Sequence, residues 1–320
     1  MARSASIKVS PLKQSELKEA DRIFRVAFGT FLGLPNPADF MGDRDFLISR
    51  WHAPHVRTLA ARDNGCLIGT NQLTRWGSFA FFGPLTILPE YWDRGVAQLL
   101  LDATMKAFDK QGLKHTGLFT FANSAKHVGL YQKFGYWPGY LTALMMHAPK
   151  AEGPQQTAAP GTVHLTVLNK SQREEAIAGC AKLTARIRTG LDLSEEIRSL
   201  LRQKTGEVVL IHTRNALDGF AICLHGAGSE GGTQTCYIKF AAARSGAGAG
   251  ERFARLLDAC DAFAAERGVS LEAGMNLARD DAYRRMRAHG FRAFAQGVSM
   301  QRPHAPGHNR GDVYVIDDWR

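Results

Sequence analysis

The sequence predicts an α/β protein with mixed sheets that is built from two tandem domains. Strand and helix periodicities alternate through the first half of the chain, and the same order of elements recurs in the second half. Between the halves lies a stretch, 149–161, that has three prolines and no periodicity, which is typical of an interdomain linker. We therefore expect one domain at 1–148 and a second at 162–320.

The elements of the first half follow from hydrophobic spacing. A helix is expected at 16–28, because Ala20, Ile23, Phe24 and Ala27 share one face. An Asp63-Asn64-Gly65 turn between two apolar runs is typical of a β-hairpin. The predicted order after the first helix is a short helix at 45–50, strands at 56–61, 67–75 and 79–87, a helix at 96–108, a strand at 115–121, a helix at 124–134 and a strand at 140–146.

The second half repeats this order with weaker motifs. Its predicted elements are a strand at 163–167, helices at 174–187 and 194–202, strands at 208–213, 220–224 and 235–241, a helix at 251–267, a strand at 270–275, a helix at 280–289 and a strand at 298–301. A glycine-rich turn at 245–250 precedes the helix at 251–267 but lacks the spacing of a Rossmann fingerprint or a P-loop.

Composition excludes several classes of protein. The chain has 320 residues, 45% of them hydrophobic, which is ordinary for a globular protein. The N-terminus lacks a signal-peptide core, and no stretch approaches the ~18 apolar residues of a membrane span. The five cysteines form no Cys-x-x-Cys pair, so neither zinc nor a disulfide framework is indicated. We expect a cytoplasmic protein that contains no metal and binds no membrane.

The charge is positive and unevenly distributed. The formal net charge is +10, and residues 1–150 hold 18 Lys and Arg against 11 Asp and Glu. This excess either attracts an anionic cofactor or forms a solvated basic surface. Because no basic run with interleaved aromatic residues occurs, we expect no binding to nucleic acid.

A short segment after the strand at 79–87 is the strongest functional motif. It reads Pro-Glu-Tyr at 89–91 and then Trp92-Asp93-Arg94-Gly95-Val96-Ala97, where a helix begins. Gly95 permits a tight turn, and the small Ala97 permits close approach to the main chain. The first amides of a helix have no internal partners and carry about half a positive charge, so they can bind phosphate. An ordinary tight turn is the alternative.

These residues, together with Leu130-Tyr131-Gln132-Lys133-Phe134-Gly135-Tyr136 on the next strand–helix unit, resemble the acetyl-CoA site of the GCN5-related N-acetyltransferases, the GNAT family. The pyrophosphate loop of that family reads Gln/Arg-x-x-Gly-x-Gly/Ala. Gly95 and Ala97 match it, whereas Trp92 replaces the usual Gln or Arg. The resemblance implies acetyl-CoA as cosubstrate and two tandem GNAT-like domains, the second diverged.

The resemblance also implies roles for individual residues. Tyr131 would protonate the departing CoA thiolate. Leu85 to Ile87 would end a splayed strand that pairs with the pantetheine arm of the cofactor, and Asn123 would form hydrogen bonds with the amide groups of that arm. The implied cofactor-binding residues are Leu85, Thr86, Ile87, Trp92, Asp93, Arg94, Gly95, Val96, Ala97 and Asn123. The alternatives are that Tyr131 is a core residue, that Leu85 to Ile87 belong to a fully paired strand, and that Asn123 is a helix N-cap.

The implied activity is transfer of an acetyl group to a primary amine by direct attack, with no covalent enzyme intermediate. The acceptor would be a small molecule or a peptide. An apolar cluster between Phe28 and Phe40 would either suit an acceptor with a hydrophobic body or fold onto the protein's own core. The base that deprotonates the amine is unassigned, with Glu90, Asp63 and His55 as options. His127 could reach the cofactor, but a solvated surface histidine is the favoured interpretation.

The second half resembles a domain that has lost this chemistry. Aligning Gly290 with Gly135 places Met286 at the position of Tyr131, and a thioether cannot donate a proton. The alternative function for the whole chain is a non-catalytic acyl-CoA-binding or regulatory protein.

Overall fold

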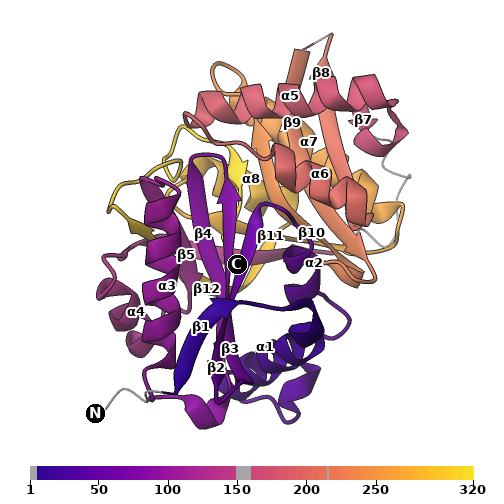
Figure 1. Cartoon of the computed structure of the whole chain (residues 1–320). Coiled ribbons are helices and arrows are strands. Elements are labelled where there is room, and N and C mark those ends of the chain that lie inside the picture. Colours follow the sequence, from indigo (N-terminus) through magenta and orange to yellow (C-terminus); the bar gives the residue numbers. More distant parts are fainter. Residues whose placement is uncertain (1–5, 149–159, 215) are drawn as a thin grey trace.

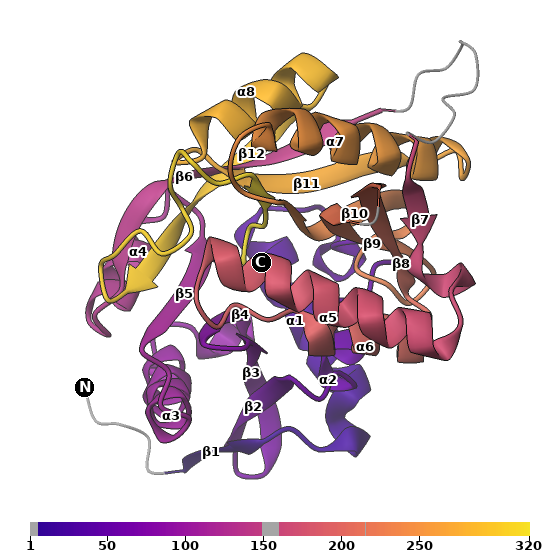
Figure 2. The same ribbon diagram turned by 90° about the horizontal axis from the view of Figure 1, so that it is seen from above.

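The computed structural model describes residues 6–148, 160–214 and 216–320. Most of the predicted linker, 149–159, lies outside these ranges. Within the described residues, thirteen strands form one continuous mixed sheet with helices on both faces (Figures 1 and 2). The α/β class predicted from the sequence is therefore confirmed.

The first half supplies one end of the sheet. Its elements are β1 (Ile7–Pro11), α1 (Leu17–Phe31), α2 (Leu47–Trp51), β2 (Val56–Asp63), β3 (Cys66–Trp76), β4 (Phe79–Ile87), α3 (Val96–Lys110), β5 (His115–Thr120), α4 (Ala125–Gln132) and β6 (Trp137–His147).

The buried face of α1 and the turn between β2 and β3 agree with the prediction. The apolar face of α1, with Ala20, Ile23, Phe24 and Ala27, is buried. Asn64 and Gly65 both have positive φ, as a two-residue hairpin turn requires, and they join β2 to β3. β1, where no strand is predicted from the sequence, pairs with β2 at the edge of the sheet.

The second half supplies the other end of the sheet. Its elements are β7 (Thr162–His164), α5 (Lys170–Ile187), α6 (Ser194–Gln203), β8 (Gly206–Thr213), β9 (Ala216–Gly226), β10 (Gly232–Ala243), α7 (Ala249–Ala265), β11 (Ser270–Asn276), α8 (Asp280–His289), β12 (Arg292–Arg302) and β13 (Val315–Ile316). The strand predicted at 163–167 is shorter than expected, because the chain turns into a 3-10 helix at Leu165–Val167.

The two halves exchange their last long strands. The sheet order is β1-β2-β3-β4-β5-β12-β6-β11-β10-β9-β8-β7, so β12 of the second half lies between β5 and β6 of the first. In turn, β6 lies between β12 and β11 of the second half, and Figure 2 shows these strands side by side. Each half therefore completes the sheet of the other.

Buried charges also join the halves. Arg50 on α2 makes a bidentate ion pair with Glu230, with N–O distances of 2.9 and 2.7 Å. The Lys239 ammonium lies 2.6 Å from Glu230 and 3.0 Å from Glu196. These carboxylates are buried, but each has cationic partners that offset the cost of desolvation.

All five cysteines are free thiols, and four of them are buried. None of the helices in the described ranges combines the length and the apolar character that crossing a bilayer requires.

Candidate active site

A cleft of about 1070 Å³ opens in the first half, between the end of β4, the start of α3, α4 and the end of α1. Tyr131 lines this cleft, and so does every predicted cofactor-binding residue except Asn123, which is exposed on the turn before α4. The lining residues are Ala27, Phe28, Phe31, Leu85, Thr86, Ile87, Tyr91, Trp92, Asp93, Arg94, Gly95, Val96, Ala97, Gln98, Phe121, Ala125, Lys126, His127, Gly129, Leu130, Tyr131 and Lys133.

One wall of the cleft is an open strand edge. β4 pairs with β3 as far as Ile87, but it pairs with β5 only from Phe79 to Phe81. A shift in register between Phe82 and Leu85 bends β4 at this point, as a β-bulge does. In the described part of the chain, no strand pairs with the β5-facing edge of Leu85 to Ile87. Of the two alternatives from the sequence, the structure has the splayed strand.

The floor of the cleft is the turn into α3. Asp93 and Gly95 both adopt left-handed backbone conformations, with φ of 61° and 79°. Gly95 is the N-cap of α3, and no side chain caps the amides that follow it. Alternating left- and right-handed residues point successive N–H groups into one concavity, which favours an anion. The helix dipole of α3 adds to the same positive potential.

Trp92 occupies the wall between these two features. Its indole N–H donates a hydrogen bond to the carbonyl of Ile87 over 2.8 Å. The side chain therefore fastens the turn to the open end of β4, and the cleft beside it stays large. The missing Gln or Arg at this position is replaced by a contact within the protein.

Tyr131 both packs in the core and faces the cleft. Only 7% of the residue is exposed, and its ring lies 5.7 Å from that of Phe82. Burial raises the pKa of the phenol far above its usual value, and a hydrogen bond with Thr120 opposes this only in part. The phenol is therefore protonated at neutral pH and can donate a proton.

Aromatic rings form the wall opposite β4. The ring of Phe31 lies 5.0 Å from that of Phe121 and 5.1 Å from that of His127. Phe28 also lines the cleft, whereas Phe40 packs on Phe24 and Phe28 in the protein's own core. The apolar cluster predicted before residue 42 is thus divided between the cleft and the core.

His127 is a residue whose environment the sequence interpretation missed. It is half-buried in the cleft wall rather than solvated on the surface. Burial lowers its pKa, and the positive charge of Lys126 lowers it further. The imidazole is therefore neutral at pH 7 and can accept a proton.

The three bases considered from the sequence lie elsewhere. None of Glu90, Asp63 and His55 is among the residues that line the cleft. His55 is 2.9 Å from Glu196 in a buried ion pair, and Glu90 is exposed. The carboxylate that does line the cleft is Asp93, which forms an exposed pair with Lys126 at 2.6 Å.

In the second half, the corresponding opening is filled by the chain itself. β10 pairs with β11 only from Thr235 to Ile238, so its end is splayed like that of β4. The gap holds β13, which pairs with β10 at Ala241 and Ala242. This short strand belongs to the C-terminal segment, which ends at the centre of the molecule (Figure 1).

Side chains also cover the turn into α7. The Arg252 guanidinium donates to the carbonyl of Arg244 at 2.8 Å and to those of Ser245 and Gly246 at 3.3 Å. The Arg285 guanidinium is so close to Gly250 that a Cβ there would lie 2.4 Å from it. Met286 is fully buried in the core of this half.

Comparison with known proteins agrees with this geometry. The family model described as Acetyltransferase (GNAT) family matches residues 22–136. Among curated protein sequences, none matches the chain.

Solved structures match over nearly the whole chain. A protein from Pyrococcus horikoshii described as a proposed acetyltransferase has a TM-score of 0.69 at 15% identity, covering 98% of this chain and 95% of its own. A GCN5-related N-acetyltransferase from Sphaerobacter thermophilus has a TM-score of 0.59 at 14% identity, covering 94% and 96%. A tandem GNAT protein from the clavulanic acid biosynthesis pathway has a TM-score of 0.55 at 13% identity, covering 92% and 98%.

At these identities the solved structures establish the fold alone, and that fold is the two-domain one. The family model adds the sequence pattern of the first half, where the open strand edge, the turn into α3 and Tyr131 meet in one cleft. Residues 22–136 therefore match the GNAT acetyltransferase family, and the chain as a whole has the fold of solved two-domain acetyltransferase structures.

Proposed function

We propose that the first half transfers an acetyl group from acetyl-CoA to a primary amine of a small molecule or peptide. The observation that carries this proposal is the single cleft, which combines an anion-binding turn, an open strand edge and a protonated phenol. The family as a whole supports acyl transfer from acetyl-CoA, and the named residues specify how this chain would perform it.

The cofactor would lie along β4 and across the start of α3. The amides after Gly95 would hold the pyrophosphate, and the side chain of Arg94 would add positive charge to the cleft, whereas that of Lys126 is paired with Asp93. Pantetheine would pair with the part of the open edge of Leu85 to Ile87 that Trp92 leaves free, as an added strand pairs with a sheet. Asn123 is exposed beside the cleft, so we assign it at most a contact with the outer part of the arm.

The reaction would be a direct displacement. The amine nitrogen attacks the thioester carbonyl, a C–N bond forms, and the C–S bond breaks. Tyr131 donates its proton to the departing thiolate, while His127 accepts the proton that the amine loses. His127 fits this role because it is neutral and lies in the aromatic wall, on the side of the cleft where an apolar acceptor would pack.

The second half would support the first rather than catalyse. We propose a catalytic domain at 1–148, a linker at 149–161 and a non-catalytic domain at 162–320. This assignment is supported by β13 in the gap beside β10, by the arginines over the turn into α7 and by the buried Met286. Each chain would then bind one CoA.

The test is steady-state release of free thiol from acetyl-CoA in the presence of a panel of amines. Calorimetric titration of the same protein with CoA measures the stoichiometry. We expect one CoA per chain and amine-dependent thiol release with at least one acceptor class. Tight CoA binding without turnover across the panel would contradict catalysis and favour an acyl-CoA sensor. Two CoA molecules per chain would contradict the role given to the second half.

A further inference from the structure

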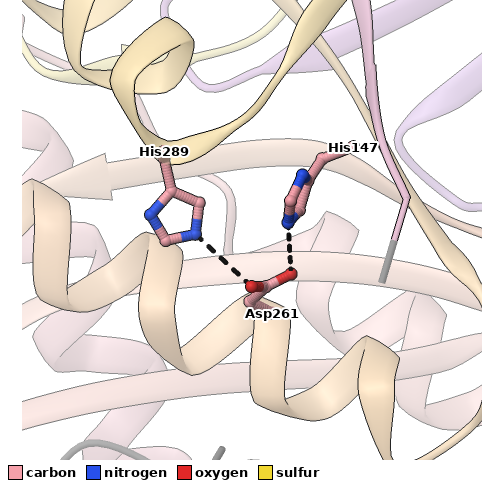
Figure 3. Close-up of side chains that lie close together, drawn as sticks. All are labelled: His147, Asp261 and His289. Carbon is pink, nitrogen blue, oxygen red and sulfur yellow. Dashed lines mark ion pairs between the residues drawn. The ribbon is translucent and has the colours of Figure 1, made fainter. Parts of the chain in front are cut away.

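Two histidines and one aspartate, residue types that commonly bind metals, meet where the end of β6 lies beside α7 and α8. His147 ends β6, Asp261 lies on α7, and His289 ends α8 (Figure 3). Nε2 of His147 is 3.0 Å from one Asp261 oxygen, and Nε2 of His289 is 3.7 Å from the other. One ligand atom from each of the three residues lies within 4.8 Å of the others.

The two ring nitrogens face one carboxylate. Nε2 of His147 and Nε2 of His289 are both buried, and each faces Asp261 without the geometry of a hydrogen bond. Both converge on the same carboxylate, as Figure 3 shows. A cation between these groups would bind both ring nitrogens through their lone pairs and the carboxylate at the same time.

From this arrangement we propose that His147, Asp261 and His289 bind one divalent transition-metal ion of the zinc class. Two imidazoles and one carboxylate form a common zinc ligand set, with a water in the fourth position. Ligand atoms around a tetrahedral zinc are about 3.3 Å apart, given bonds of about 2.0–2.1 Å. The His147–Asp261 distance of 3.0 Å is close to this value, whereas the ligand atoms of all three residues lie within 4.8 Å of one another, so the third ligand must move closer when the ion binds.

The surroundings support this assignment. Nδ1 of His289 lies 3.6 Å from a carboxylate oxygen of Asp258, which is the kind of outer partner that orients a ligating histidine. The ring of Phe291 lies 5.4 Å from that of His147 and gives the site an apolar side.

The position of the site defines what the ion does. His147 comes from the first half and sits at the end of the exchanged strand β6, whereas the other two ligands come from the second half. The ion would therefore hold the end of β6 against α7 and α8 of the second half, and its binding would stabilise the folded chain by mass action. The three residues are far apart in the sequence, so no local motif could reveal this ligand set.

The test uses the full chain after treatment with a chelator. Zn²⁺ affinity is measured by competition with a chromophoric chelator, and Co²⁺ is used to read the coordination number from its visible absorption. We expect one ion per chain, a tetrahedral Co²⁺ spectrum and a rise in melting temperature on adding Zn²⁺. Asp261→Asn and His289→Ala should each weaken Zn²⁺ binding at least tenfold and abolish the rise.

The controls separate a built site from surface binding. His304→Ala changes an exposed histidine and should leave Zn²⁺ affinity unchanged. Asp258→Asn should weaken binding by a smaller factor than Asp261→Asn, because it removes only the outer partner. If Asp261→Asn does not fold, His289→Gln at the end of α8 decides. Absence of stoichiometric binding, or binding that Asp261→Asn and His289→Gln leave intact, overturns the proposal and leaves an Asp–His ion-pair cluster.

Discussion

The indole of Trp92 and the carbonyl of Ile87 are joined by a hydrogen bond of 2.8 Å. This bond ties the turn before α3 to the open end of β4, which are the two backbone elements assigned to the cofactor. Arg94 lies over the ring of Tyr91 at 5.1 Å and holds the neighbouring part of the turn. The geometry of the cradle therefore depends on the aromatic side chains of Trp92 and Tyr91 as well as on its backbone.

Trp92→Phe should weaken CoA binding by about 2- to 10-fold, which corresponds to the loss of one hydrogen bond of about 0.5–1.5 kcal/mol. The ring remains to fill space, but the turn loses its link to β4. The measurement is calorimetric titration with CoA. Trp137→Phe, at a half-exposed tryptophan of β6, is the matched control and should bind like the parent. Tighter CoA binding in Trp92→Phe would mean that the indole competes with the cofactor.

Gly95→Asp should reduce CoA affinity at least tenfold. The substitution places a negative charge at the start of α3 and forces a side chain into a left-handed conformation, at φ 79°. Gly112→Asp is the matched control, because Gly112 lies past the other end of α3 with φ 66° and open space around it. Both variants should lose stability, by about 1–2 kcal/mol. Only the first should lose CoA, and equal affinities in two folded variants would place the anion site elsewhere.

Tyr131→Phe should lower kcat by about 100-fold or more, because it removes the proton donor for the leaving thiolate. The Kd for CoA should stay within about twofold, since the phenyl ring keeps the packing against Phe82. Stopped-assay rates and calorimetry measure the two quantities separately. Tyr140→Phe, on an exposed residue, should have the parent's rate. A Tyr131→Phe enzyme with full activity would remove this residue from the mechanism.

Much of the fold was predictable because its signals are local. Periodicity placed helices and strands, and the Asn64-Gly65 turn fixed the first hairpin. The exchange of β6 and β12 was not predictable, because strand partners are chosen by packing across the whole chain rather than by a local pattern. For the same reason no sequence signal showed that β13 would fill the gap beside β10.

The candidate site likewise has a part that the sequence predicts and a part that only the tertiary structure shows. The turn around Gly95 and the strand before it carry their chemistry in consecutive residues, so a motif could reveal them. The environment of His127 depends on Phe31, which arrives from α1, and no spacing between the two residues indicates that contact. The converging nitrogens of His147 and His289 are likewise a product of tertiary structure alone.

Arg50→Met should destabilise the protein by about 3–5 kcal/mol, because it removes one partner of a buried bidentate pair and leaves Glu230 short of a cation. Urea denaturation measures the change. Arg198→Met is the control, since its pairs with Glu174 and Glu195 are exposed and should contribute less than about 1 kcal/mol. A loss as small as that of the control would mean that Lys239 alone neutralises the buried carboxylates.

The same pair sets a pH dependence of stability. Burial alone would raise the pKa of Glu230, but Arg50 and Lys239 hold it below its usual value. A depressed pKa contributes stability above the unfolded value of about 4.3, and this contribution is lost as the pH falls below it. The parent should therefore lose stability on acidification more steeply than Arg50→Met. Parallel stability curves for the two proteins would contradict this assignment.

His127→Gln should change the pH profile of kcat/KM as well as its size. The pKa of His127 is lowered by burial and by Lys126, so the ring loses its proton on the acid side of its usual value. Below that pKa both the histidine and the acceptor amine must lose a proton, and log kcat/KM should rise with a slope of about 2. Above it only the amine titrates, and the slope should be about 1.

In His127→Gln the slope should be about 1 at every pH below the pKa of the amine, with a lower kcat and little change in CoA affinity. His304→Gln, at an exposed histidine, should keep the parent's two slopes. A merely structural role for His127 would lower the rate equally at all pH values and leave the break in the profile. That outcome would mean that another group accepts the proton of the amine. Loss of the change in slope would identify the imidazole of His127 as the proton acceptor.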